Sequence, residues 1–259
     1  MARITGAQDL FAHALLEPSL VTTAQVNPDL LKARFAASDA DIKRLARIDE
    51  AGLARAAHIL HGKRRRQLGW ILPATRTLLF DDAVGHVVVT DYLDSVLPWR
   101  ESDEPRQQLA EALRFSAFLQ EDVRVSAALA QLTAFEVVRY DVMTRPIITR
   151  ENANPGRTSS GRLTGGTEIV SFDYDVLAMR SSALSHELPE KWPPAETHIV
   201  LHRNDREPIR IFRVEPSVAC LLVSYASIPR LADLAAQCEI ELVDAERIIS
   251  QSIAMGMLL

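Results

Sequence analysis

The sequence predicts an α+β protein, with an all-helical N-terminal domain followed by a small β-β-β-α-α-α winged-helix-like domain. Three observations support this fold class. Apolar residues recur at helical spacing through most of residues 1–149. Residues 150–166 (RENANPGRTSSGRLTGG) lack periodicity and are rich in Gly, Ser, Asn and Thr, as linkers are. Residues 167–259 then alternate as strands do before three short amphipathic segments, so we expect a helical domain at 1–149, a linker at 150–166 and a second domain at 167–259.

The helical half contains three segments with clear helical periodicity, at residues 39–61, 64–79 and 125–142. Gly62 lies between the first two segments, and we expect the chain to break or bend there. Pro73 lies inside the second segment and predicts a kink, because proline removes a backbone donor. Short connections between such helices favour a packed bundle.

The clearest strand of the C-terminal half is residues 208–214, whose alternation predicts one buried face and one freer face. Asn204 and Asp205 favour a turn that pairs it, as a hairpin, with a strand at 198–203. Residues 177–196, between the first and second strands, contain three prolines and are expected to lack a regular element.

Three short helices are expected to begin near Pro216, Ser227 and Asp244. Each has apolar residues spaced by three or four positions, which would pack against the sheet. The two cysteines, Cys220 and Cys238, fall on the apolar sides of the first two helices. We expect them to be small buried hydrophobic residues rather than a disulfide or a metal pair.

Composition limits the function classes. The chain has 259 residues, of which 47% are hydrophobic and 24% charged, the balance of a globular protein with room for two domains. Its net charge of -5 argues against a general nucleic-acid binder. The N-terminus lacks a basic start followed by an apolar run, and no apolar run approaches the ~20 residues that span a bilayer. We therefore expect a cytoplasmic protein with neither a membrane nor a nucleic-acid partner.

The sequence predicts no catalytic set, because it lacks GxSxG, HExxH and P-loop motifs. His58 and His61 are three residues apart, but no carboxylate at suitable spacing completes a metal site with them. Glu136 precedes Arg139 and Tyr140 at helical spacing, so an internal ion pair or hydrogen bond explains it without catalysis. We expect no catalytic residue, no metal site and no cofactor in this chain.

The strongest charge cluster is the basic run at 63–66. It is either a solvated turn of a helix or a contact for phosphates or an acidic partner. The acidic residues Asp91 and Asp94, in contrast, are expected to be solvated charges. If the basic run docks a partner, the candidate interface residues are Arg64, Arg65, Arg66 and Trp70.

A strand at a sheet edge offers unpaired backbone N–H and C=O groups, to which an extended peptide can add. If the strand at 208–214 is such an edge beside the third helix, Ile209, Ile211 and Arg213 would line one side of a peptide groove. Alternatively, Ile209 and Ile211 pack inside the domain. The candidate peptide-binding residues are Ile209, Arg210, Ile211, Phe212 and Arg213 on the strand and Arg247, Ile248 and Gln251 on the third helix.

The helical half also carries a pattern of an apolar-Pro step, an acidic helix start and a helix closed by an aromatic residue and a proline. The residues are Trp70-Ile71-Leu72-Pro73, Asp81-Asp82, Tyr92 and Pro98, followed by FSAFL at 115–119 and LTAFE at 132–136. This pattern resembles a helical family, labelled DNA-binding, that is found beside multinuclear non-haem iron enzymes acting on ribosomally made peptides. The element order of the C-terminal half resembles the PqqD-like element that binds precursor leaders. Together, the chain resembles the MbnC-type accessory subunits of methanobactin biosynthesis.

The resemblance implies a non-catalytic subunit. MbnC-type proteins form a complex with an MbnB-type enzyme, which holds the iron and does the chemistry. That complex uses O2 to convert cysteines of an MbnA-type precursor peptide into an oxazolone and a neighbouring thioamide, giving a copper chelator. The helical half would then dock on the iron enzyme, and the C-terminal sheet would pair with the precursor leader.

Two other hypotheses remain open. A winged-helix transcriptional regulator would place the third helix, 244–255, in the major groove of DNA. That helix carries Glu246 and only Arg247 as a basic residue, whereas phosphate contacts normally need several Lys or Arg. The other hypothesis is an independent enzyme whose catalytic residues are dispersed along the chain.

Overall fold

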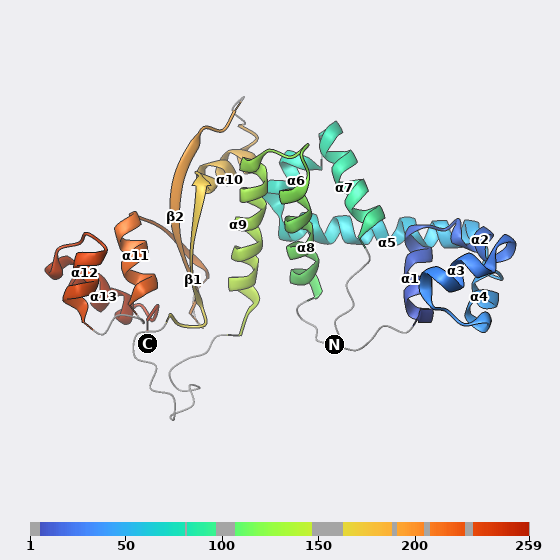
Figure 1. The fold of residues 1–259 in the computed structure, drawn as a ribbon. Helices are drawn as coiled ribbons and strands as arrows, with labels where there is room; N and C mark the ends of the chain where they lie inside the picture. The colour runs from blue at the N-terminus through green and yellow to red at the C-terminus, as the bar shows by residue number, and fades with distance from the viewer. Residues whose placement is uncertain are drawn as a thin grey trace. The chain divides into compact units, whose positions relative to one another are not determined.

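The protein combines many helices with a small three-stranded antiparallel sheet, which confirms the α+β class (Figure 1). The chain divides into two compact units, residues 1–125 and 126–259. The division falls earlier than the expected linker at 150–166, because helix α9 (Ala127–Thr144) packs against the sheet. Most of that linker lies outside the described residues. The computed structural model describes residues 6–80, 82–96, 107–146, 163–187, 191–204, 208–225 and 230–258.

The first unit begins with four short helices that share one apolar cluster. Leu10, Leu31 and Leu45 are fully buried in it, and Leu53 packs against it from the next helix. Ser38 fixes the start of the fourth helix, because its side chain accepts a hydrogen bond from the Asp41 N–H. The four helices are α1 (Gly6–Leu16), α2 (Leu20–Val26), α3 (Pro28–Phe35) and α4 (Asp39–Leu45).

The prediction of a break or bend at Gly62 is wrong, because helix α5 runs without interruption from Glu50 to Ile71. Gly62 is exposed, with open space where a side chain would be, so it costs the helix only about 1 kcal/mol relative to alanine. Pro73 does more than kink the chain: it is the first residue of a new helix, where its missing N–H is not needed. The rest of the unit consists of α6 (Pro73–Leu79), α7 (Ala83–Ser95) and α8 (Gln107–Glu121).

The second unit contains a helix that the sequence did not predict. Helix α10 (Val176–Ser185) lies in the segment expected to lack regular structure. Asp175 caps it by accepting a hydrogen bond from Ala178 N–H, and Met179 anchors it in the core. The prolines of that segment all follow the helix. The other elements are β1 (Thr167–Tyr174), β2 (Pro194–His202), β3 (Arg210–Val214), α11 (Pro216–Ser224), α12 (Leu231–Gln237) and α13 (Leu242–Ala254).

The sheet has the order β1-β2-β3, and helices cover both of its faces (Figure 1). The antiparallel pairing of β2 with β3 confirms the expected hairpin, although residues 205–207 of its turn lie outside the described residues. On one face, Phe135 of α9 meets Phe172 of β1 edge to face, with ring centroids 6.0 Å apart. On the other face, Val200 lies in an apolar cluster with Leu221 and Ile249 from α11 and α13.

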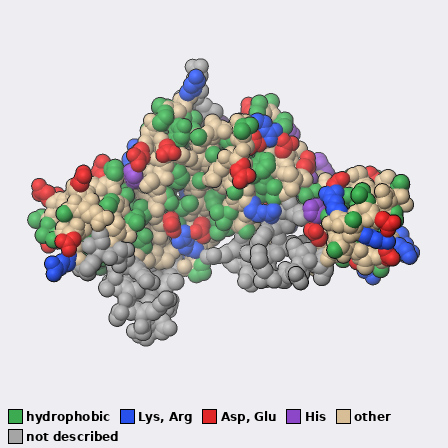
Figure 2. Space-filling view, viewed as in Figure 1, with side chains coloured by type: hydrophobic (Ala, Val, Ile, Leu, Met, Phe, Trp, Pro, Cys, Tyr) green, Lys and Arg blue, Asp and Glu red, His purple; other side chains and the backbone are tan. Residues whose placement is uncertain are grey.

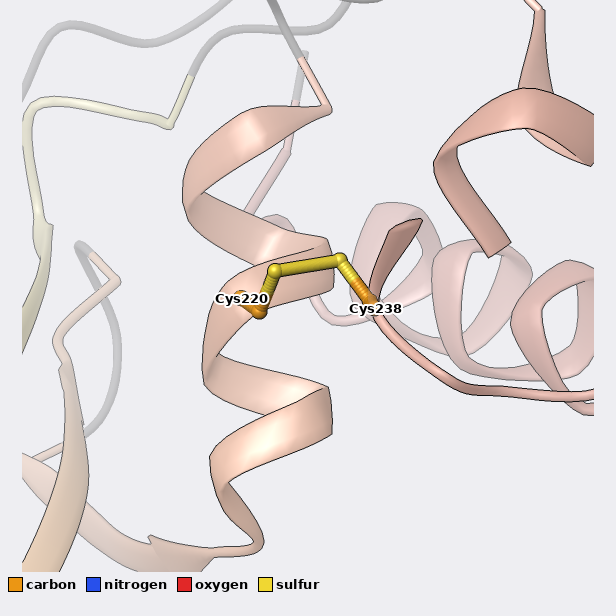
Figure 3. The surroundings of a disulfide bond; sticks show 2 residues. All are labelled: Cys220 and Cys238. Atoms are coloured by element: carbon orange, nitrogen blue, oxygen red, sulfur yellow. A yellow bond between two sulfur atoms is a disulfide. The ribbon is translucent and has the colours of Figure 1, made fainter. Parts of the chain in front are cut away.

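The prediction for the two cysteines is wrong: Cys220 and Cys238 form a disulfide (Figure 3). Cys220 lies within α11, and Cys238 caps the C-terminus of α12. Because these two helices pack together, the Cα atoms lie 5.8 Å apart, a normal separation for a bridge. Both cysteines also belong to the apolar surroundings of the helical cluster, so burial does not exclude the bond.

Candidate functional site

Strand β3 lies at an edge of the sheet, pairing only with β2 among the described strands. One hydrogen bond shows which backbone groups the central strand uses on each side. Just beyond β2, Arg203 N–H donates to the Gly166 carbonyl at 2.9 Å. Because the backbone groups of successive residues in a strand point to opposite sides, Leu201 and Ile199 bond to β1, whereas Val200 bonds to β3.

The open backbone groups of β3 follow from this alternation. Phe212 lies opposite Val200 and directs its N–H and C=O groups toward β2. Ile211 and Arg213 therefore direct theirs away from the sheet. These are the groups with which an added peptide strand would pair. Ile209, which the sequence grouped with these two residues, precedes β3 in the structure.

The side chains of Ile211 and Arg213 lie on the face of the sheet that is turned away from the third helix. Arg213 Nη2 donates to Asp175 Oδ1 at 2.5 Å, so this face is the one covered by α9 and α10. Phe212, in contrast, packs against the cluster formed with α11 to α13. Of the two placements that the sequence left open, a groove lined by the Ile211 and Arg213 side chains together with the third helix does not match this arrangement, because successive side chains of a strand point to opposite faces.

The residues expected on helix α13 differ in their surroundings. Ile248 is partly buried and packs against the same apolar cluster as Phe212. Arg247 and Gln251 are exposed, and Arg247 pairs with Asp244 at 2.7 Å. We call the open backbone of Ile211 and Arg213, together with the side chains of Phe212 and Ile248, the β3 edge surface.

Sequence reasoning missed the exposed apolar residues of the helical cluster. Val243 has 74% of its surface exposed, and three more apolar residues of α13 and its end are at least one-third exposed. Val243 alone of these residues falls outside the i, i+3, i+4 series that packs inward, and that spacing is the signal that could have identified it. These residues add exposed apolar area to the surface of the second unit, and are Leu242, Val243, Ile253 and Met255.

In the basic run, Arg64 is not a surface residue, so its predicted place in a solvated or partner-binding cluster is wrong. It is only 4% exposed, and its Nε lies 2.7 Å from Glu111 Oε1. Its Nη1 donates to the Leu93 carbonyl at 3.1 Å, and its guanidinium lies over the Tyr92 ring. Burial of the Tyr92 side chain raises the pKa of its phenol well above the usual value.

Arg65 is also engaged within the first unit. Its Nη2 donates to the Phe80 carbonyl at 2.9 Å and lies 2.9 Å from His86 Nδ1. The guanidinium also covers the Phe80 ring, at 5.4 Å from its centroid. Of the three predicted arginines, Arg66 alone is exposed to solvent.

The outer side of α5 nevertheless carries a continuous set of exposed residues. Trp70 is 70% exposed and Ile59 is 71% exposed, with Lys63 and Arg66 between them. Their spacing of four, three and four residues places them on one side of the helix over three turns. We call Ile59, Lys63, Arg66 and Trp70 the α5 stripe. Exposed tryptophan next to cations is typical of protein interfaces.

Helices α7 and α8 and the turn after them form an acidic groove of about 570 Å³. Arg124 pairs with Asp91 at 2.7 Å and with Asp122 at 2.5 Å. Its hydrogen bonds lower the pKa of the Asp122 carboxyl to about 2. Asp122 is therefore charged at neutral pH. Arg124 pairs with two of the four acidic side chains of the groove, so the groove keeps a net negative charge. The groove is lined by Asp91, Asp94, Ser95, Phe118, Glu121, Asp122 and Arg124.

The histidines take part in local contacts. His61 Nδ1 lies 3.4 Å from Asp94 Oδ1, and burial lowers the pKa of its imidazole below the usual value. In the sheet, His198 Nδ1 lies 2.7 Å from Ser171 Oγ. Within the described ranges, no three His, Cys, Asp or Glu side chains are grouped so as to hold a metal ion.

No protein-family model matches this chain, and no curated protein matches it either. Among the helices described, none combines the length and the apolar character needed to cross a membrane. On the face shown in Figure 2, acidic and basic side chains of the described residues are interspersed rather than gathered by sign.

Proposed function

We propose that this chain is a non-catalytic accessory subunit that presents a ribosomally made precursor peptide to an iron-dependent enzyme. In the terms of the resemblance, it would bind an MbnB-type enzyme and the leader of an MbnA-type precursor. The partner would hold the iron and use O2 to convert precursor cysteines into oxazolone and thioamide groups. This chain would contribute binding, and the reaction would belong to the partner.

The observation that carries the proposal is the open edge of β3 beside the α11–α13 cluster. A peptide strand added there would pair with the backbone of Ile211 and Arg213. Phe212 and Ile248 would offer apolar contacts on one side. The unit resembles a winged-helix-like recognition element, but α10 is inserted between its first two strands. That insertion departs from the β-β-β-α-α-α order inferred from the sequence.

The α5 stripe is the surface that we assign to the partner enzyme. It combines an exposed indole with two cations, so an acidic and partly apolar partner surface would complement it. Of the interface residues chosen from the sequence, Arg66 and Trp70 keep this role. Arg64 and Arg65 instead donate hydrogen bonds to Glu111 and to the Phe80 carbonyl within the first unit.

A cytoplasmic location stays a prediction, and the Cys220–Cys238 bond is an observation against it. Disulfides are rare in cytosolic proteins because glutathione and thioredoxin keep thiols reduced. The DNA-binding hypothesis gains no support from α13. Arg247 is already paired with Asp244, and Glu246 is exposed beside it.

The proposal is tested by co-expressing the full chain with an MbnB-type enzyme and an MbnA-type precursor. We expect the two proteins to co-purify, iron to follow the enzyme, and the pair to bind the precursor more tightly than the enzyme alone. Failure to bind either the enzyme or the precursor would contradict the proposal. Salt-sensitive binding of duplex DNA by the isolated chain would favour the regulator instead.

A further inference from the structure

A hydroxyl and an imidazole meet on neighbouring strands of the sheet. Ser171 of β1 lies directly opposite His198 of β2, and the Ser171 Oγ is 2.7 Å from the His198 Nδ1. The adjacent residues Val170 and Ile199 direct their backbone groups toward each other, so this pair has no backbone hydrogen bonds of its own. Side chains lie closest together in such pairs, so the strand register itself fixes the contact. No short motif marks the pair in the sequence, because its members are 27 residues apart.

A carboxylate lies on the other side of the imidazole. Glu196 Oε1 is 3.2 Å from His198 Nε2. The two atoms are not aligned as a hydrogen bond, so Glu196 acts on the buried Nε2 through its charge. A negative charge beside Nε2 favours the tautomer with the proton on that nitrogen, which leaves Nδ1 to accept a hydrogen bond from the Ser171 hydroxyl. A nucleophile in contact with a base that a third group orients is the arrangement that activates a serine for attack on acyl groups.

A second pair on the same two strands shows what is particular to Ser171. Thr167 Oγ1 lies 3.0 Å from His202 Nδ1, in the same cross-strand arrangement. Thr167 and His202 are only 4% and 3% exposed, so this hydroxyl is closed to a substrate. Ser171 is exposed, although only 13% of the His198 side-chain surface is. Of the two hydroxyls, that of Ser171 alone combines an adjacent imidazole with access from solvent.

We propose that Ser171 is a nucleophile for acyl transfer, with His198 as its general base and Glu196 as the residue that positions the imidazole. The Ser171 Oγ would bond to the carbonyl carbon of an ester while its proton passes to His198 Nδ1. The bond to the leaving alcohol then breaks, and the alcohol takes up that proton. Water next attacks the acyl-serine, and His198 takes a proton from it and returns one to Oγ as the acid leaves. The overall reaction is the hydrolysis of an ester.

The backbone N–H of Ser171 would stabilise the negative charge that develops on the carbonyl oxygen. Backbone groups alternate along a strand, so this N–H points away from β2, at the outer edge of β1. Because Ser171 is exposed, little protein surface surrounds a group bound to its hydroxyl. Small activated esters, which need little binding energy to react, are the substrate class that suits such a site. This activity is separate from the reaction assigned above to the partner enzyme and does not depend on it.

The test is covalent labelling of the full chain with diisopropyl fluorophosphate, a small reagent that phosphorylates activated serines and releases fluoride. Peptide mapping by mass spectrometry locates the label. We expect Ser171 to react about a hundredfold or more faster than the exposed Ser181 of α10, since a general base contributes roughly 10²–10⁴-fold. Thr167 should stay unlabelled, although it has an imidazole beside it. Hydrolysis of p-nitrophenyl acetate should slow in Ser171→Ala and stay at the parent rate in the matched control Ser181→Ala.

Two further variants separate the roles of the base and of the carboxylate. His198→Gln should slow the labelling of Ser171 to the rate of Ser181, with circular dichroism to verify folding. In the parent, the nitrogen chemical shifts of His198 should show the proton on Nε2, whereas Glu196→Ala should give a mixture of tautomers. An unaltered tautomer would contradict the positioning role of Glu196. Equal labelling of Ser171 and Ser181 in the parent chain would overturn the proposal, as would an unchanged labelling rate in folded His198→Gln.

Discussion

Replacing Arg64 by methionine should destabilise the protein far more than its place in a basic run suggests. Arg64 and Glu111 are 4% and 5% exposed, and Nε and Oε1 are 2.7 Å apart. Methionine would keep much of the apolar stem but leave the Glu111 carboxylate buried without its cation. Removing one partner of a buried ion pair costs about 3–5 kcal/mol. The hydrogen bond from Arg64 to the Leu93 carbonyl would be lost as well.

Urea unfolding of the full chain, followed by circular dichroism, measures this loss. Arg66→Met, on the exposed side of the same helix, is the matched control and should change the unfolding free energy by less than about 0.5 kcal/mol. The double variant Arg64→Met/Glu111→Met removes both charges and should return to within about 2 kcal/mol of the parent. Equal stability of the Arg64→Met and Arg66→Met variants would refute the argument. A double variant as unstable as Arg64→Met would assign the loss to packing instead.

Three further predictions concern the disulfide, a partly buried histidine and the α5 stripe. Because Cys220 and Cys238 are 18 residues apart, reducing their bond should lower the free energy of unfolding by about 3 kcal/mol. Treatment with dithiothreitol should raise the intact mass by two hydrogens, and an unchanged mass would contradict the bond. The pKa of His61 is lowered by burial, so the unfolded chain takes up the proton first. The free energy of unfolding should therefore fall as pH drops below about 6.5. His61→Gln should flatten that part of a curve of Tm against pH. An unchanged curve would refute the role of His61 in this pH dependence. Trp70→Ala and Arg66→Glu should weaken enzyme binding in a pull-down without lowering the Tm, and undiminished binding would remove the stripe from the interface.

Patterns among residues close together in the sequence were enough to predict a strand, its hairpin and one helix boundary. The alternation of 208–214 correctly indicated β3 and its hairpin with β2. Pro73 correctly marked a discontinuity between two helices. Gly62 misled because a single glycine in an exposed helix costs little, and the long flanking segments outweigh that cost. Helix α10 was overlooked because its cap, Asp175, precedes a segment whose prolines all lie further on.

Other features depend on packing that a single sequence does not show. The disulfide could not be predicted without knowing that α11 and α12 bring Cys220 and Cys238 together. The side of the sheet that Ile211 faces depends on which helices cover each face, and only the structure supplies that. Arg64 is different, because the signal was available: it precedes Leu68 by four residues, on the inward side of α5.

The most direct test of the proposed function compares two substitutions at one residue of β3. Ile211→Pro would remove a backbone N–H that points away from β2, a position where an edge strand tolerates proline. Ile211→Ala would lose most of the same side chain and keep the N–H. Fluorescence anisotropy of a labelled MbnA-type precursor would measure binding to each full-length variant, with circular dichroism to verify folding. We predict binding to the alanine variant and binding weaker by roughly tenfold or more for the proline variant. Equal affinity of the two folded variants would contradict peptide pairing at the β3 edge.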